Sequence, residues 1–149
     1  MKKSNSIAFI LARKNSKRFK FKNIKKLGNL MLIEHTILAV MNSKCFNEII
    51  ISSDDKKILD LAKKYKKIKF LKRPNRLAGD HTKALDVLLF YCQELSLNEN
   101  FKYISLFLPT APFKNPKHIQ KGFSMLKSAT IDFVISVCKI LPPIQFAMI

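Results

Sequence analysis

The sequence contains no tryptophan, only three glycines and three cysteines, and ten acidic residues in a total of 149. Neither a GxxxxGK[ST] phosphate-binding loop nor a GxGxxG dinucleotide fingerprint occurs in it. The cysteines, Cys45, Cys92 and Cys138, are odd in number and far apart, which argues against a disulfide framework and against zinc-ligand spacing. No uninterrupted apolar run approaches the roughly 20 residues that span a bilayer. With no recognisable signal peptide, we expect a cytoplasmic protein.

Basic residues are abundant, because 28 Lys and Arg oppose 10 Asp and Glu and give a net charge of +18. Such an excess fits a polyanionic partner, either nucleic acid or a phosphate-bearing small molecule. The excess is mostly lysine, however, in a chain that is also rich in Ile, Asn and Phe, a mixture that A/T-rich coding sequence would produce. Two explanations of the positive charge therefore stay open at this point. One is compositional drift together with a phosphate-bearing ligand, and the other is nucleic-acid binding as the main task.

Short apolar runs alternate along the chain with segments of helical periodicity. The runs predict buried strands at 7–11, 49–52, 70–71, 103–108 and 133–138. The periodic segments predict helices at 33–43, 56–65 and 82–96 and a fourth that begins at Pro116. Asp54 or Asp55 is a suitable N-cap for the second helix, and Asp80 is a candidate cap for the third.

Nearly continuous apolar strands separated by helices indicate a parallel sheet covered on both faces. We therefore predict one domain over residues 1–149 with an α/β fold, a Rossmann-like, doubly wound, mainly parallel sheet in a three-layer α/β/α arrangement. In such sheets the ligand lies beyond the carboxyl ends of the strands. The important loops are then 12–23, 52–55, 73–80 and 109–114.

The first of these loops carries the strongest chemical signal. It holds six cations and no acid, at positions 13, 14, 17, 18, 20 and 22. Arginine grips phosphate oxygens in a bidentate fork, lysine acts as a point charge, and Ser16 could add a neutral donor. The loop is therefore a candidate binding site for a nucleoside triphosphate. A solvated run of surface charge is the alternative interpretation.

The same loop is similar to the signature of acylneuraminate cytidylyltransferases and of their bacterial relatives acting on legionaminic or pseudaminic acid. That signature is roughly Pro-Ala-Arg-x-Gly-Ser-Lys-x-x-x-x-Lys-Asn. Six positions match it in register, namely Ala12, Arg13, Ser16, Lys17, Lys22 and Asn23. Three further motifs follow in the family's order, namely Ser52-Ser53-Asp54-Asp55, Arg73-Pro74 with Leu77-Ala78 and Asp80, and Leu108-Pro109-Thr110-Ala111-Pro112-Phe113. The resemblance covers nearly the whole chain.

The resemblance implies transfer of CMP from CTP to a sialic-acid-like nonulosonic acid, with release of pyrophosphate and with Mg²⁺ as cofactor. It implies that Arg13 and Lys17 neutralise charge during catalysis, and that Ser16 and Lys22 help to hold the triphosphate. Asn23 and Arg73 would hold the cytidine, and the loop with Pro109 and Thr110 would line the nucleotide or sugar pocket. It assigns no metal ligand in this chain. The structural alternative for Arg73 is an ordinary surface arginine. Asp54 and Asp55 are expected to cap a helix, and metal binding is their alternative role.

The chain departs from the family pattern in three places. Leu11 stands where the family has Pro, Asn15 replaces Gly, and Leu108 replaces a Gln suited to hydrogen bonding with a base. Family members also extend beyond the point equivalent to Ile149, so we expect a C-terminally incomplete domain without the homodimer-forming segment. We expect no membrane partner and no nucleic acid. The alternatives are an inactive or truncated nucleotide-binding remnant and a basic nucleic-acid-binding module.

Overall fold

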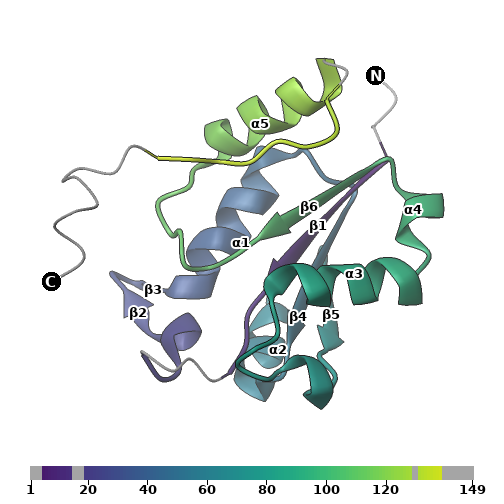
Figure 1. The fold of residues 1–149 in the computed structure, drawn as a ribbon. Helices are drawn as coiled ribbons and strands as arrows, with labels where there is room; N and C mark the ends of the chain where they lie inside the picture. The colour runs from purple at the N-terminus through teal and green to yellow at the C-terminus, as the bar shows by residue number, and fades with distance from the viewer. Residues whose placement is uncertain (1–4, 15–18, 129–130, 139–149) are drawn as a thin grey trace, which may run out of the picture.

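The computed structural model describes residues 5–14, 19–128 and 131–138 of the chain. Its centre is a four-stranded parallel sheet in the order β5-β4-β1-β6 (Figure 1). The strands are β1 (Ser6–Leu11), β4 (Glu48–Ser53), β5 (Ile68–Lys72) and β6 (Tyr103–Phe107). In register, Phe9 of β1 lies between Ile50 of β4 and Leu106 of β6. All residues of β1 are buried, as expected for a central strand covered on both faces.

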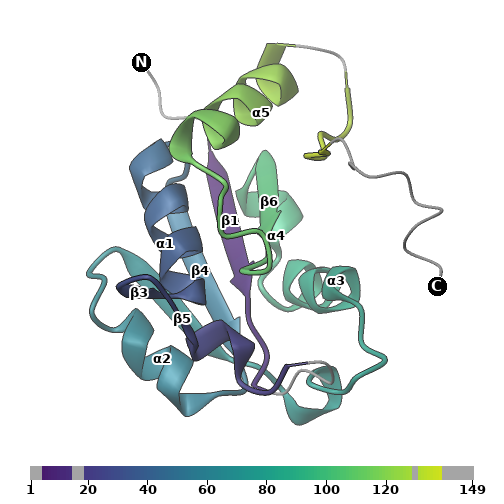
Figure 2. The same cartoon turned by 90° about the vertical axis from the view of Figure 1, so that its left-hand side faces the viewer.

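Helices cover both faces of this sheet (Figure 2). One face packs against α1 (Leu32–Ser43), α2 (Lys56–Ala62) and α5 (Pro116–Ser128), and the other against α3 (Ala84–Glu94) and α4 (Leu97–Asn100). Alternate residues of β1 supply the two cores, since Ala8 and Ile10 join the first and Ile7 and Phe9 join the second. The predicted three-layer, doubly wound α/β fold is therefore confirmed.

A small β-hairpin between the first strand and the first helix was not predicted from the sequence. The 3₁₀ helix η1 (Lys22–Ile24) leads into β2 (Lys26–Leu27), which pairs antiparallel with β3 (Leu30–Met31). Its two-residue loop is Gly28-Asn29, with Gly28 at φ 64°. Gly-Asn between apolar residues is a hairpin signal, because glycine tolerates the positive φ that such turns require.

The two predicted aspartate caps have different outcomes. Asp55 is the N-cap of α2, and its carboxylate accepts a hydrogen bond from the Lys57 amide at 2.9 Å, which confirms that prediction. The cap predicted at Asp80 is wrong, because α3 begins later, after Lys83. The loop before α3 contains the short 3₁₀ helix η2 (Asn75–Leu77), and Asp80 faces the first loop instead. No helix within the described ranges is long and apolar enough to cross a membrane.

The strand predicted at Phe133–Cys138 is wrong. The segment forms no regular structure, and Phe133, Ile135 and Val137 expose 74%, 71% and 84% of their surface. It runs beside α5, where Val134 approaches Gly122, and it does not extend the sheet next to β6 (Figure 1). An apolar run becomes a strand only when its backbone N–H and C=O groups pair with a neighbouring strand. Apolar character alone does not provide that neighbour.

Candidate functional site

The carboxyl ends of β1 and β6 form the point where the strand order of the sheet changes direction. The chain builds outward from β1 through β4 to β5, and then returns to place β6 on the other side of β1. At such a switch point the two following loops diverge and leave a crevice for a ligand. The loops here begin at Ala12 and at Leu108, because β1 ends at Leu11 and β6 ends at Phe107. They start side by side, since Ile10 and Phe107 are paired neighbours in the sheet.

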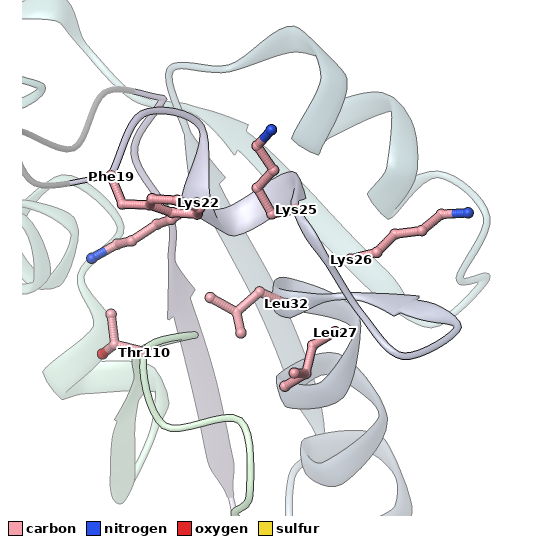
Figure 3. A pocket seen from close by; sticks show the side chains of 7 residues that line it. All are labelled: Phe19, Lys22, Lys25, Lys26, Leu27, Leu32 and Thr110. Carbon is pink, nitrogen blue, oxygen red and sulfur yellow. The ribbon is translucent and has the colours of Figure 1, made fainter.

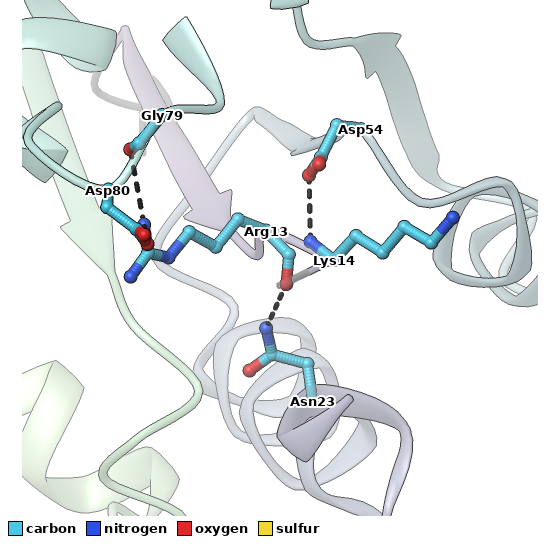
Figure 4. Close-up of polar contacts among 6 residues, drawn as sticks. All are labelled: Arg13, Lys14, Asn23, Asp54, Gly79 and Asp80. Carbon is cyan, nitrogen blue, oxygen red and sulfur yellow. Dashed lines mark hydrogen bonds and ion pairs between the residues drawn. The ribbon is translucent and has the colours of Figure 1, made fainter. Parts of the chain in front are cut away.

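Arg13 leaves β1 and reaches across to the loop that precedes α3 (Figure 4). Its Nη1 donates to Asp80 Oδ1 at 2.9 Å and to the Gly79 carbonyl at 3.2 Å. The backbone is fixed on the opposite side, where the Lys14 amide donates to Asp54 Oδ1 at 2.8 Å. The Lys14 side chain extends away from this cluster into solvent. The cation at position 13 is thus held at the edge of the sheet.

Asn23 is the buried polar residue of this cluster, with only 4% of its surface exposed. Its Nδ2 donates to the Arg13 carbonyl at 2.8 Å, whereas its Oδ1 is buried without a hydrogen-bond partner in the described part of the chain. A left-handed turn at Phe21, with φ 56° and ψ 27°, precedes η1 and directs Asn23 inward. A buried acceptor without a partner is rare and suggests a donor supplied by a ligand.

Arg73 is also buried, with 5% of its surface exposed, so the alternative interpretation as a surface arginine is wrong. Its Nη2 donates to the Ser52 carbonyl at 3.1 Å and its Nε to Ser52 Oγ at 3.4 Å. Ser52 Oγ in turn bonds to the hydroxyl of Tyr91 at 2.9 Å. Burial lowers the pKa of Arg73, and the nearby Asp54 carboxylate partly opposes that shift. Because an arginine stays protonated in proteins, the group is a buried cation at the sheet edge.

A hollow of about 420 Å³ opens between η1, the hairpin and the loop after β6 (Figure 3). Its lining contains basic and apolar side chains, one hydroxyl side chain and no acid, namely Phe19, Lys22, Lys25, Lys26, Leu27, Leu32 and Thr110. The Lys22 ammonium points toward Thr110, whereas Lys25 and Lys26 extend away from the hollow. Pro109 is buried at the start of the same loop. The two loops of the switch point therefore face each other across this hollow.

The structure thus brings several of the predicted site residues to one edge of the sheet. Arg13, Asn23 and Arg73 lie around the ends of β1 and β4, while Lys22 and Thr110 share the neighbouring hollow. Ser16 and Lys17 lie outside the described residues. Sequence reasoning missed Lys114, whose ammonium contacts both the loop after β6 and α1. No local pattern marks a contact between residues so far apart in the chain.

Carboxylates are sparse at this edge. Asp54 accepts from the Lys14 amide, and Asp80 pairs with Arg13. Within the ranges that the structure describes, no three His, Cys, Asp or Glu side chains gather as a metal site would require. These residues do not fit a magnesium ion held by the protein alone, and the Mg²⁺ cofactor stays a prediction.

The chain resembles known proteins in sequence and in fold. The Cytidylyltransferase family matches residues 7–141. The CMP-N,N'-diacetyllegionaminic acid synthase of Legionella pneumophila is 36% identical over 137 residues, which cover 90% of this chain and 58% of that protein. The Helicobacter pylori protein named pseudaminic acid cytidylyltransferase and UDP-2,4-diacetamido-2,4,6-trideoxy-beta-L-altropyranose hydrolase is 34% identical over 132 residues, which cover 88% of this chain and 25% of that protein. The chain therefore spans 58% of the length of the first of these relatives and 25% of the second.

Solved structures agree on the fold. A CMP:2-keto-3-deoxy-manno-octonic acid synthetase complexed with CTP superposes with a TM-score of 0.66 at 17% identity, over 83% of this chain and 48% of that one. A 4-diphosphocytidyl-2C-methyl-D-erythritol synthase from Anaerococcus prevotii gives 0.62 at 20% identity, over 84% and 52%. Because the family match covers most of the sequence and the fold agrees with it, this chain belongs to the cytidylyltransferase family.

Proposed function

We propose that this chain is the nucleotide-binding part of an enzyme that transfers CMP from CTP to a sialic-acid-like nonulosonic acid. The relatives named above for CMP-legionaminic acid and pseudaminic acid support this choice of acceptor. The observation that carries the proposal is the group of cations at the carboxyl edge of the sheet. Arg13 and Arg73 lie around the ends of β1 and β4, and Lys22 lines the neighbouring hollow. We further propose a cytoplasmic location, which suits the three free cysteines.

In the proposed reaction, the anomeric hydroxyl oxygen of the sugar acid forms a bond to the α-phosphorus of CTP. The bond from that phosphorus to the bridging oxygen breaks, pyrophosphate leaves, and the hydroxyl proton passes to solvent. The contribution of the protein is positioning and charge neutralisation, which are large terms in phosphate-transfer chemistry. Arg13 would exchange its contact with Asp80 for a phosphate oxygen, and Lys22 would add a second positive charge. Lys17 and Ser16 remain predicted partners of the triphosphate.

Two buried groups suit the nucleoside. The Asn23 Oδ1 atom is an acceptor without a partner among the described residues, so it can accept from the cytosine amine or from a ribose hydroxyl. Arg73, held by Ser52, can donate to an acceptor on the base or the sugar. Leu108 has no polar side-chain atom. We therefore assign the reading of the base to Asn23 and Arg73 and not to the loop after β6.

CTP binding by the purified chain tests the proposal. Isothermal titration with CTP and Mg²⁺ should show saturable binding, and Arg13→Met should weaken it about tenfold or more because a charge-assisted hydrogen bond is lost. Lys14→Met is the matched control, because it removes the same charge from the adjacent residue, whose side chain points away from the cluster. Equal losses of CTP affinity in the two variants would show that any positive charge in this loop has the same effect, and would contradict the proposed site.

Two further measurements separate the alternatives. Pyrophosphate release with CTP and a panel of sialic, legionaminic and pseudaminic acids identifies the acceptor. If CTP binds but no acid in the panel causes pyrophosphate release, the chain is an inactive remnant. Binding to single-stranded RNA, with a salt dependence that reflects several phosphate contacts, would favour the nucleic-acid-binding alternative. Both faces of the sheet are covered by helices, so the aromatic sheet platform that many RNA-binding domains use is not available here.

A further inference from the structure

The loop from Leu108 to Asn115 connects β6 to α5 and forms one wall of the switch-point crevice. It contributes Thr110 to the hollow that Lys22 faces. Its own backbone hydrogen bonds are long, since the Ala111 amide lies 3.5 Å from the Leu108 carbonyl and the Lys114 amide lies 3.5 Å from the Ala111 carbonyl. Bonds at that distance are weak. Some other interaction must therefore hold the loop in its observed shape.

The Lys114 ammonium supplies that interaction. Its Nζ donates to the Ala111 carbonyl at 2.6 Å, to the Leu108 carbonyl at 2.9 Å and to Thr36 Oγ1 at 3.2 Å. A lysine ammonium has three N–H donors, and all three are used here. Two of these bonds draw together the carbonyls that the loop's own amides bind only weakly. The third ties the loop to α1.

The attachment point on α1 lies in the protein interior. Thr36 is fully buried, and its neighbour in the core, Ile37, is fully buried as well. Burial of Lys114 lowers the pKa of its amine to about 8, so enclosing this cation in the fold has an energetic cost. A lysine that only improved solubility would stay in water. Its half-buried position, with every donor engaged, indicates that the cation shapes the loop.

We propose that Lys114 is a positioning residue. It acts as a clamp that holds the loop after β6 so that Thr110 faces Lys22 across the hollow. This inference rests on the proposed function, because it assigns Lys114 a role in CTP binding. Lys114 does not itself contact the nucleotide, since its three donors are already bound to Thr36, Leu108 and Ala111. Its effect on binding passes through the loop.

Hydrogen–deuterium exchange of the ligand-free chain tests the clamp without any nucleotide. Lys114→Met keeps the length of the side chain but removes its donors. The backbone amides of residues 108–115, apart from Pro109 and Pro112, which have none, should therefore exchange about fivefold faster or more. Amides of α1 should be unchanged. Lys117→Met is the control, because it removes an exposed lysine from the neighbouring α5. If the loop exchanges equally in the wild type and in Lys114→Met, the clamp does not exist.

CTP titration tests the functional half of the proposal. Lys114→Met should weaken CTP binding about tenfold, Lys117→Met should leave it unchanged, and Lys114→Arg should recover part of the loss. Recovery is partial because a planar guanidinium cannot direct donors to three acceptors arranged around one ammonium. Unchanged affinity in Lys114→Met with a loosened loop would overturn the role in binding. Absence of CTP binding in the wild type would instead contradict the proposed function, while the exchange experiment still decides the clamp.

Discussion

The hydroxyl of Tyr91 can be tested as a structural support of the buried Arg73. Tyr91 lies on α3 and is 5% exposed. Its hydroxyl forms a hydrogen bond with Ser52 Oγ, which also accepts a hydrogen bond from Arg73 Nε. Its ring stacks on Phe9 with the centroids 5.7 Å apart. Substitution of Tyr91 by Phe removes one oxygen and keeps the ring. The variant therefore isolates the hydrogen bond from the packing.

The expected loss of stability follows from the contacts that remain. After Tyr91→Phe, the hydrogen bond left to Ser52 Oγ among the described residues is that from Arg73 Nε at 3.4 Å, which is at the weak limit for a hydrogen bond. A buried hydrogen bond contributes about 1 kcal/mol net, and somewhat more where a charged group shares the network. We expect the free energy of unfolding to fall by about 1–2 kcal/mol. For a chain of this size each kcal/mol lowers the Tm by roughly 2–4 °C.

Thermal and urea unfolding followed by circular dichroism measure this loss. Tyr103→Phe is the matched control, because Tyr103 is half-buried on β6 and its hydroxyl makes no hydrogen bond with any other described residue. Its ring also packs edge-to-face on an aromatic neighbour, Phe123. Equal losses in the two variants would refute the role of the Tyr91 hydroxyl. A loss above about 3 kcal/mol in Tyr91→Phe would instead mean that the ring packing had not survived.

Two other predictions concern stability. Lys44, exposed at the end of α1, has φ 55° and ψ 21°, so Lys44→Gly should raise the free energy of unfolding by about 1 kcal/mol in urea titrations. Asn42→Gly, at an exposed position within the helix, should instead lower it by roughly a few tenths of a kcal/mol, and a loss in both variants would contradict the argument. The pKa of Lys114 falls from its usual 10.5 to about 8 in the folded chain, so the unfolded chain holds more protons between these values. The stability of the wild type relative to Lys114→Met should therefore rise from pH 8 to 10, by about 1 kcal/mol after allowing for solvent screening, and a flat or falling difference would contradict the shift.

The candidate site was predictable only in part. The loops at the carboxyl ends of β1, β4, β5 and β6 could be located from the sequence, because parallel strands place their carboxyl ends at one edge. The motif around Arg13 and Asn23 predicted that this edge binds a nucleoside triphosphate. The partners of these residues were not predictable. Asp80 was expected to cap a helix and binds Arg13 instead. The sequence could not indicate this contact, because the two residues lie 67 positions apart.

The sequence by itself determined the order and type of the main elements. Runs such as Ile7–Leu11 and the periodic apolar positions of α2 identify strands and helices locally, because burial on a strand or a helix face repeats with a fixed period. It also determined that cations follow the first strand.

Only the tertiary structure decided which segments become neighbours. It left Phe133–Cys138 outside the sheet and buried Arg73 beneath Ser52. It also placed the Lys114 ammonium against Thr36, 78 residues away in the sequence. Contacts at such separations depend on how the layers pack as a whole, because each must offset the entropy of closing a long loop. No local pattern of residues encodes that balance.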